Sequence, residues 1–150
     1  MAAKKKAFRT NVHAIFATDK AREEDGAWVE VNGFYGLKIK VRRFRSDASM
    51  KAYERIVRET FGDGKLRKPS DLTNEQSTDM LKAQLAEGVL IDWTNLRDSE
   101  TGEEIPYSVE IARELMDITD FREFVYQAAN ERDTFRELAD KEAEGNSSGS

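Results

Sequence analysis

The sequence of 150 residues contains no cysteine and only one histidine, His13. Without cysteine the chain forms neither a disulfide nor a thiolate zinc site. A single histidine excludes a His–His metal pair, the lack of cysteine excludes a Cys–His dyad, and no sequence pattern around His13 indicates a Ser-His-Asp triad. We interpret His13 as an ordinary side chain, partly buried or at the surface.

Motifs that bind phosphates or metals are absent as well. The glycines at 33 and 36 and at 62 and 64 match neither a GxGxxG pattern nor a Walker loop. The acidic segment 98–104 lacks the twelve-residue ligand spacing of a calcium loop. The carboxylate runs at 23–25 and 103–104 lie in polar loops, where no apolar pocket raises a pKa for acid–base catalysis. The sequence therefore predicts a protein that is not an enzyme and binds no metal or cofactor.

Long apolar runs are also missing. No stretch approaches the ~18 consecutive apolar residues that a membrane span needs. The basic start MAAKKKAFRT is not followed by the apolar run of a signal peptide. We therefore expect a soluble protein that is not exported and makes no membrane contact.

Charge is plentiful, and it is divided along the chain. Charged residues make up 35% of the sequence, and the formal net charge is −5. Residues 1–70 hold 17 Lys and Arg against 9 Asp and Glu, whereas residues 71–150 hold 7 against 20, so the halves carry +8 and −13. In one interpretation the two halves face each other within the fold or form separate solvated faces. In the other, the basic half binds the acidic half of a neighbouring copy, head to tail, or an acidic partner.

Local patterns predict a mostly helical α+β fold with one domain over residues 11–140. Two alternating runs around Asn32 and Gly33 predict an N-terminal antiparallel β-hairpin at about 27–44. Hydrophobic periodicity predicts four helices, at about 48–61, 74–92, 109–117 and 119–140. Residues 1–10 are expected to form a flexible arm and residues 141–150 a disordered tail.

Residues at helix ends support this assignment. Thr73 and Gln76 have the spacing of a capping box at the start of the second helix. Ser108 can cap the third helix, after Pro106 has held the preceding residue extended. Gly88 inside the second helix costs about 1 kcal/mol relative to alanine, which predicts close packing or a bend at this point.

The stretch from 88 to 135 is expected to form the centre of the core. It contains one of the two Trp and two of the four Tyr, with a polar turn between its apolar runs. This turn lets the flanking helices fold back on each other. We therefore expect one cluster made of Trp93, Tyr107, Leu115, Phe121, Phe124 and Val125.

The strand segment 38–45, KIKVRRFR, is the one feature that favours nucleic-acid binding. It carries five cations, with Phe34, Tyr35 and Phe44 close by. The outward face of a strand is commonly charged, however, and exposed lysines there discourage edge pairing. Because the whole chain is also acidic, we expect no nucleic-acid partner and keep a small DNA-binding regulator as the weaker alternative.

The order of these features resembles the tail assembly chaperones of long-tailed, siphovirus-like bacteriophages. The resemblance extends over about residues 12–138. It rests on the basic hairpin strand, on Asp92-Trp93, on the segment from Gly102 to Ser108, and on the run from Asp120-Phe121 to Phe135. This family brings no catalytic residues with it.

The resemblance implies a non-enzymatic helper in the host cytoplasm that binds the phage tape measure protein and keeps it soluble during tail assembly. The tail tube protein is a second expected partner, and several copies of the chaperone would associate. Candidate partner-binding side chains are Trp93, Tyr107, Phe121, Phe124, Val125 and Phe135. The same apolar stripes also fit the protein's own core. The alternative from another class is a structural tail or connector protein retained in the virion.

Overall fold

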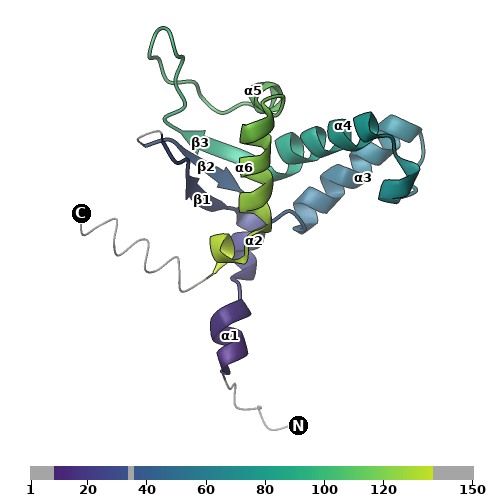
Figure 1. Cartoon of the computed structure of the whole chain (residues 1–150), viewed down its shortest axis with the longest axis horizontal. Coiled ribbons are helices and arrows are strands. Elements are labelled where there is room, and N and C mark those ends of the chain that lie inside the picture. The colour runs from purple at the N-terminus through teal and green to yellow at the C-terminus, as the bar shows by residue number, and fades with distance from the viewer. Residues whose placement is uncertain (1–8, 34–35, 137–150) are drawn as a thin grey trace.

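The computed structural model describes residues 9–33 and 36–136 of the chain. The predicted tail, most of the predicted arm and residues 137–140 of the predicted fourth helix lie outside this part. Figure 1 shows helix α6 beside a small sheet, helices α3 and α4 reaching out to one side, and helix α1 projecting at one end.

Three strands form one antiparallel sheet in the order β1-β2-β3. β1 spans Ala27–Glu30, β2 spans Lys38–Val41 and β3 spans Leu90–Thr94. The central residue Ile39 lies opposite Val29 of β1 and Trp93 of β3. A bulge between Lys40 and Val41 shifts the register against β3 and bends the sheet there.

The helices precede the sheet, interrupt it and follow it. α1 (Asn11–Phe16) and α2 (Lys20–Asp25) come before β1, α3 (Asp47–Phe61) and α4 (Asn74–Gln84) lie between β2 and β3, and α5 (Val109–Leu115) and α6 (Thr119–Asn130) follow β3. Three short helical turns complete the described part: η1 (Pro69–Asp71), η2 (Leu85–Val89) and η3 (Arg132–Phe135). Both predicted caps are present, since Thr73 and Gln76 exchange hydrogen bonds and the Ser108 hydroxyl accepts one from an amide of α5.

Helix α4 runs into strand β3 through the π-helical turn η2, with no loop between them. Gly88 in this turn lies directly against α3. A Cβ atom at Gly88 would stand 2.9 Å from the Cα of Ser49 and 3.0 Å from the Cβ of Ala52. The predicted close packing at Gly88 is therefore confirmed, and it is what allows η2 to cross α3 at this distance.

The predicted fold class is wrong in its architecture. The expected hairpin is not a separate N-terminal element, because its strands form a mid-chain sheet with β3. The helix predicted over 74–92 ends as an α-helix at Gln84, and its last residues are a strand. Two further helices, α1 and α2, precede the sheet, and the α-helical part of the predicted 119–140 helix ends at Asn130. The fold is mixed α+β.

The apolar run at the end of the predicted 74–92 helix explains the error. Val89, Leu90 and Ile91 are consecutive apolar residues, and a short run of this kind fits a buried strand as well as a buried helix. Pairing with β2 decides between the two, and β2 lies about 50 residues earlier in the chain. Tertiary contacts therefore override the local helical pattern.

The main core lies between the sheet, η2, α5 and α6. Trp93 and Val125 are buried in it, and the other four predicted members pack against it: Tyr107, Leu115, Phe121 and Phe124. The predicted cluster is therefore confirmed. A second, smaller cluster joins α3 to α4 through Ile56, Val57 and Met80.

The segment between β3 and α5 projects as a long loop above the sheet (Figure 1). Its tip is ordered by Asp98, whose carboxylate accepts the backbone amides of Glu100 and Thr101 at 2.8 and 2.9 Å. These two hydrogen bonds lower the pKa of Asp98. No helix within the described part of the chain has the length and apolar character of a membrane span.

Candidate functional site

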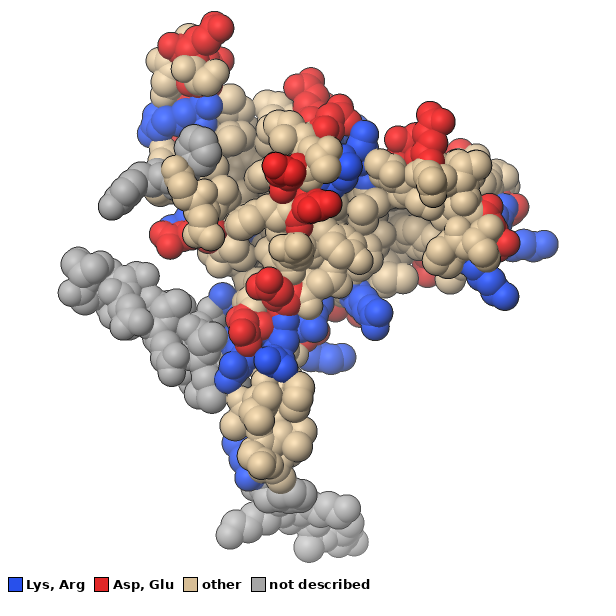
Figure 2. Space-filling view, in the orientation of Figure 1, with Lys and Arg blue, Asp and Glu red and all other residues tan. Residues whose placement is uncertain are grey.

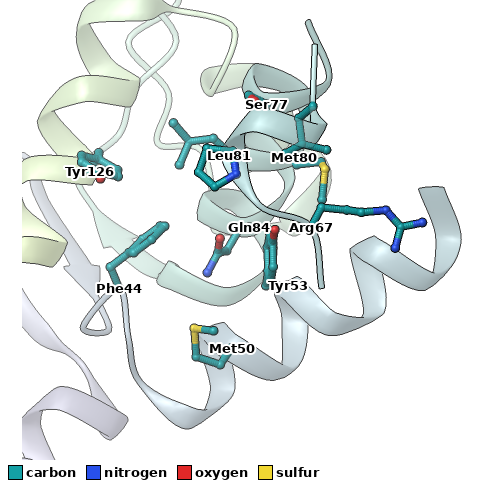
Figure 3. Close-up of a pocket in the computed structure, with 11 residues that line it drawn as sticks. Phe44, Met50, Tyr53, Arg67, Ser77, Met80, Leu81, Gln84 and Tyr126 are labelled. Atoms are coloured by element: carbon teal, nitrogen blue, oxygen red, sulfur yellow. The ribbon is translucent and has the colours of Figure 1, made fainter. Parts of the chain in front are cut away.

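An open groove of about 440 Å³ lies between α3, α4 and the later part of the segment that joins them, with α6 along one side. Figure 3 shows its labelled side chains converging from these elements. In Figure 2 the visible surface between α6 and the projecting helix pair α3 and α4 is mostly uncharged. The lining residues are mainly apolar: Phe44, Met50, Tyr53, Arg67, Pro69, Leu72, Ser77, Met80, Leu81, Gln84 and Tyr126.

The helical repeat accounts for the two main walls. Met50 and Tyr53 stand one turn apart on α3, and Met80 and Gln84 stand one turn apart on α4 with Leu81 beside them. Each wall is fixed at its helix start, because the Ser46 hydroxyl accepts the amide of Ser49 in α3 and the capping box closes the first turn of α4.

Tyr126 of α6 forms the remaining side of the groove. Its ring meets Phe44 edge to face, with ring centroids 5.1 Å apart and an interplanar angle of 62°. Tyr126 remains 39% exposed, so its ring faces a partner-accessible surface. A second hollow, of about 420 Å³, lies on the other side of Tyr126 and Leu81 between α4 and α6. The two hollows share these two residues, so they lie next to each other along α4.

Arg67 is held rigidly at the edge of the groove. Its guanidinium forms a two-pronged pair with Asp63, with N–O distances of 2.9 and 3.0 Å, and donates to the carbonyl of Lys65 at 2.6 Å. The same group lies over the Phe61 ring at 4.3 Å. The hydrogen bonds from Arg67, followed by the backbone amide of Lys65, lower the pKa of Asp63 to about 2. Arg67 and Asp63 therefore place an ion pair, whose charges compensate each other, beside an apolar groove.

Gln84 lies in the wall between α4 and α3 and is only 4% exposed. Its Nε2 donates to the Ser49 hydroxyl at 3.0 Å and to the Ser49 carbonyl at 3.4 Å. Gln84 is thus a buried polar residue among mostly apolar lining residues.

The six predicted partner-binding side chains do not line the groove. Trp93, Val125 and Phe135 are at most 5% exposed, and Tyr107, Phe121 and Phe124 pack against the same core cluster. In the folded chain these side chains contact other parts of the same molecule. Partner binding by them stays a prediction, and it would require the core to open.

The sequence pattern places part of the groove lining on the apolar faces of helices, but it does not indicate a binding surface. Met50 and Tyr53 belong to the apolar stripe of α3, and Met80 and Leu81 belong to that of α4. The Met residues on these two helix faces are a signal for a binding surface, since Met is common at adaptable binding surfaces. Tyr126 carried no such signal.

Two of the five cations in the basic segment 38–45, Arg42 and Arg43, are engaged within the protein. Arg42 donates through Nε to the carbonyl of Glu24 at 2.8 Å, and Arg43 lies 3.7 Å from the Glu23 carboxylate and over the Phe135 ring. These two side chains fasten α2 and η3 to the sheet. This use of the cations weakens the DNA-binding alternative.

The chain matches a known protein family. A family model described as the YdaY prophage protein matches residues 44–146. The chain belongs to the YdaY prophage protein family. The matched part begins at Phe44 and contains every residue that lines the groove, whereas strands β1 and β2 precede it. No curated protein and no solved structure matches this YdaY family member.

Membership in the YdaY family makes this a phage-derived protein. It supports the phage association that the resemblance implied. The more specific expectation of a tail assembly chaperone goes beyond what the family name states.

Proposed function

We propose that the protein is a phage tail assembly chaperone, which binds the tape measure protein and keeps it soluble while the tail tube is built. The prophage family supports the phage setting. The resemblance of segments 92–93, 102–108 and 120–135 to tail assembly chaperones supports the specific role. In this proposal the protein acts in the host cytoplasm, by binding alone and without catalysis.

The groove between α3, α4 and α6 is the observation on which the proposal depends. A long helical client exposes apolar stripes, which a chaperone must cover with a complementary apolar surface. Helix-in-groove binding uses side chains spaced by three and four residues on the client, inserted between helices of the host. The two neighbouring hollows, which share Leu81 and Tyr126, offer an apolar surface along α4 that suits such a helix.

Self-association of several copies along one client is part of the same proposal. A tape measure protein is much longer than one groove, so one copy covers only a part of it. The division of charge along the sequence, +8 against −13, supports contacts in which the basic half of one copy meets the acidic half of the next. The tail tube protein remains a proposed second partner.

Co-expression with the tape measure protein of the same prophage tests the proposal. The soluble fraction of the tape measure protein should rise with the wild-type protein. It should fall back towards the level without chaperone for Tyr126→Asp, because this change introduces a charge into both hollows. Ile118→Asp is the matched control: Ile118 is 55% exposed and lines neither hollow, so this variant should act like wild type.

Two results would contradict the proposal. If the soluble fraction of the tape measure protein is the same with and without this protein, the chaperone role is wrong. If mass spectrometry finds the protein in purified virions at the level of tail components, the structural alternative is favoured, since a chaperone should be missing from finished particles.

A further inference from the structure

We infer that Gln84 makes the groove selective for a partner helix that carries a hydrogen-bond donor on its apolar face. The inference concerns the groove itself, and it rests on the proposed function only for the identity of the natural partner. It starts from the way in which the Gln84 side chain is held.

The orientation of the Gln84 amide follows from its partner, Ser49. The Ser49 carbonyl is an acceptor only, so the atom that faces it must be the amide nitrogen Nε2. The Ser49 hydroxyl, at 3.0 Å from the same nitrogen, adds a second hydrogen bond. This arrangement disfavours the flipped amide, which would place the amide oxygen 3.4 Å from the Ser49 carbonyl oxygen.

The amide oxygen Oε1 is left without a partner on the protein. Within residues 9–33 and 36–136 no donor forms a hydrogen bond to it, and the oxygen is not fully buried. Figure 3 shows the Gln84 side chain in the groove, between Phe44 and Tyr53. Since Gln84 is only 4% exposed and lines the groove, the groove is where this oxygen meets solvent or a ligand.

An uncovered acceptor of this kind discriminates between partners. In the empty groove, water can satisfy Oε1. A helix that covers the groove removes this water, and an acceptor that is buried without a replacement weakens binding. A Ser, Thr, Asn or Gln side chain at the contact would restore the hydrogen bond. A wholly apolar helix would leave Oε1 unsatisfied and bind about 5- to 100-fold more weakly than its packing alone would give.

A double-mutant cycle on the full-length protein tests this inference. The probes are short amphipathic helical peptides that differ only by Thr or Val at one apolar position, with this exchange placed at each apolar position in turn. Thr and Val have nearly the same shape, but only Thr carries a donor. The protein variants are Gln84→Met, which removes the acceptor, and Ser49→Ala, which removes a hydroxyl on the far side of the amide and keeps Oε1.

For each peptide position, the affinity of the Thr peptide is divided by that of the Val peptide. At one position or more, this ratio should be about 5- to 100-fold higher for the wild-type protein than for Gln84→Met. Ser49→Ala should retain the wild-type ratio, even though its thermal stability falls. Thermal unfolding of each variant shows that it is folded during the measurement. A ratio that is the same for wild type and Gln84→Met at every position overturns the inference.

Overlapping peptides that cover the tape measure protein of the same prophage separate this inference from the proposed function. Coupling with the designed peptides, but no binding of any tape measure peptide, supports Gln84 selectivity and contradicts the proposed client. Binding of tape measure peptides with no coupling to Gln84 supports the client and overturns the inference. If no peptide of either kind binds, both are wrong.

Discussion

Trp93 and Tyr107 lock strand β3 to the chain segment that returns from the long loop. Their rings meet edge to face, with centroids 4.8 Å apart and an interplanar angle of 64°. The Trp93 indole donates to the carbonyl of Ile105 at 2.8 Å, and the Tyr107 hydroxyl donates to the carbonyl of Leu90 at 3.0 Å. Each ring therefore satisfies a backbone carbonyl on the segment that carries the other ring, which closes the loop at its base.

Trp93→Ala should lower the free energy of unfolding by about 3–5 kcal/mol, as truncation of a buried aromatic side chain does. Trp93 is 5% exposed, and its loss removes the contact with Tyr107 and the hydrogen bond to Ile105. Trp28→Ala is the control, because Trp28 is 41% exposed on β1. Chemical denaturation measures both variants. Equal losses of stability in the two would contradict the assignment of Trp93 to the core.

Gly88→Ala should destabilise the protein by about 1–3 kcal/mol, although alanine is the better helix former. The new methyl group would collide with the α3 backbone at Ser49. Gly64→Ala is the matched change without a collision, since the nearest atom to its Cβ is Arg58 Cγ at 3.9 Å. Thermal unfolding should show a lowered melting temperature for Gly88→Ala alone. A raised melting temperature for Gly88→Ala would mean that α3 and η2 are farther apart in solution than in this structure.

The sequence predicts well those helices whose two ends are marked by capping residues or glycine. α3 lies within one residue of its predicted start and ends at the predicted residue, Phe61. Ser46 caps its first turn, and Gly62 follows its last residue with the positive φ of 76° that favours glycine. These signals lie within a few residues of the helix end, so no tertiary information is needed to read them.

Strand β3 and the groove depend on parts of the chain that are distant in sequence. Leu90 to Thr94 form a strand because β2 offers them a pairing edge. The stripe residues Met50 and Leu81 line a groove because the crossing of α3, α4 and α6 leaves part of each stripe uncovered. An apolar stripe predicts that a helix face is to be covered, but not whether the same chain or a partner covers it.

Asp63 should titrate well below an ordinary aspartate because of its pairing with Arg67. Its pKa in the folded protein is about 2, against an ordinary value of 3.8. A lowered folded-state pKa stabilises the protein above the unfolded-state value, and this stabilisation is lost as the pH falls from about 4 towards 2. Arg67→Gln should return the pKa of Asp63 towards 3.8 and remove this part of the pH dependence.

NMR titration of the side-chain carboxyl groups measures this effect directly. Asp98 is an internal control, because backbone amides of its own turn lower its pKa and Arg67 has no part in this. The Asp98 titration should therefore be the same in wild type and Arg67→Gln. An Asp63 midpoint that does not move in the variant would show that the ion pair at the groove edge does not form in solution.

Self-association should depend on salt if oppositely charged halves of neighbouring copies attract each other. Ion pairs within one molecule, such as Arg55 with Glu87 at 2.8 Å, already neutralise part of the charge across the division. The remainder is available for contacts between copies. The screening length falls from about 10 Å at 0.1 M salt to about 3 Å at 1 M, so exposed charges then act only at contact distance.

Sedimentation velocity at low and high salt tests this dependence, both for the protein alone and for its complex with the tape measure protein. Raising the salt above ~0.5 M should reduce the number of copies per client. The apolar contacts of single copies in the groove should persist, because the hydrophobic effect is not screened by salt. The same number of copies at every salt concentration would contradict the electrostatic contact while leaving groove binding intact. Complete release of the client at high salt would instead mean that charge, and not the apolar groove, holds the tape measure protein.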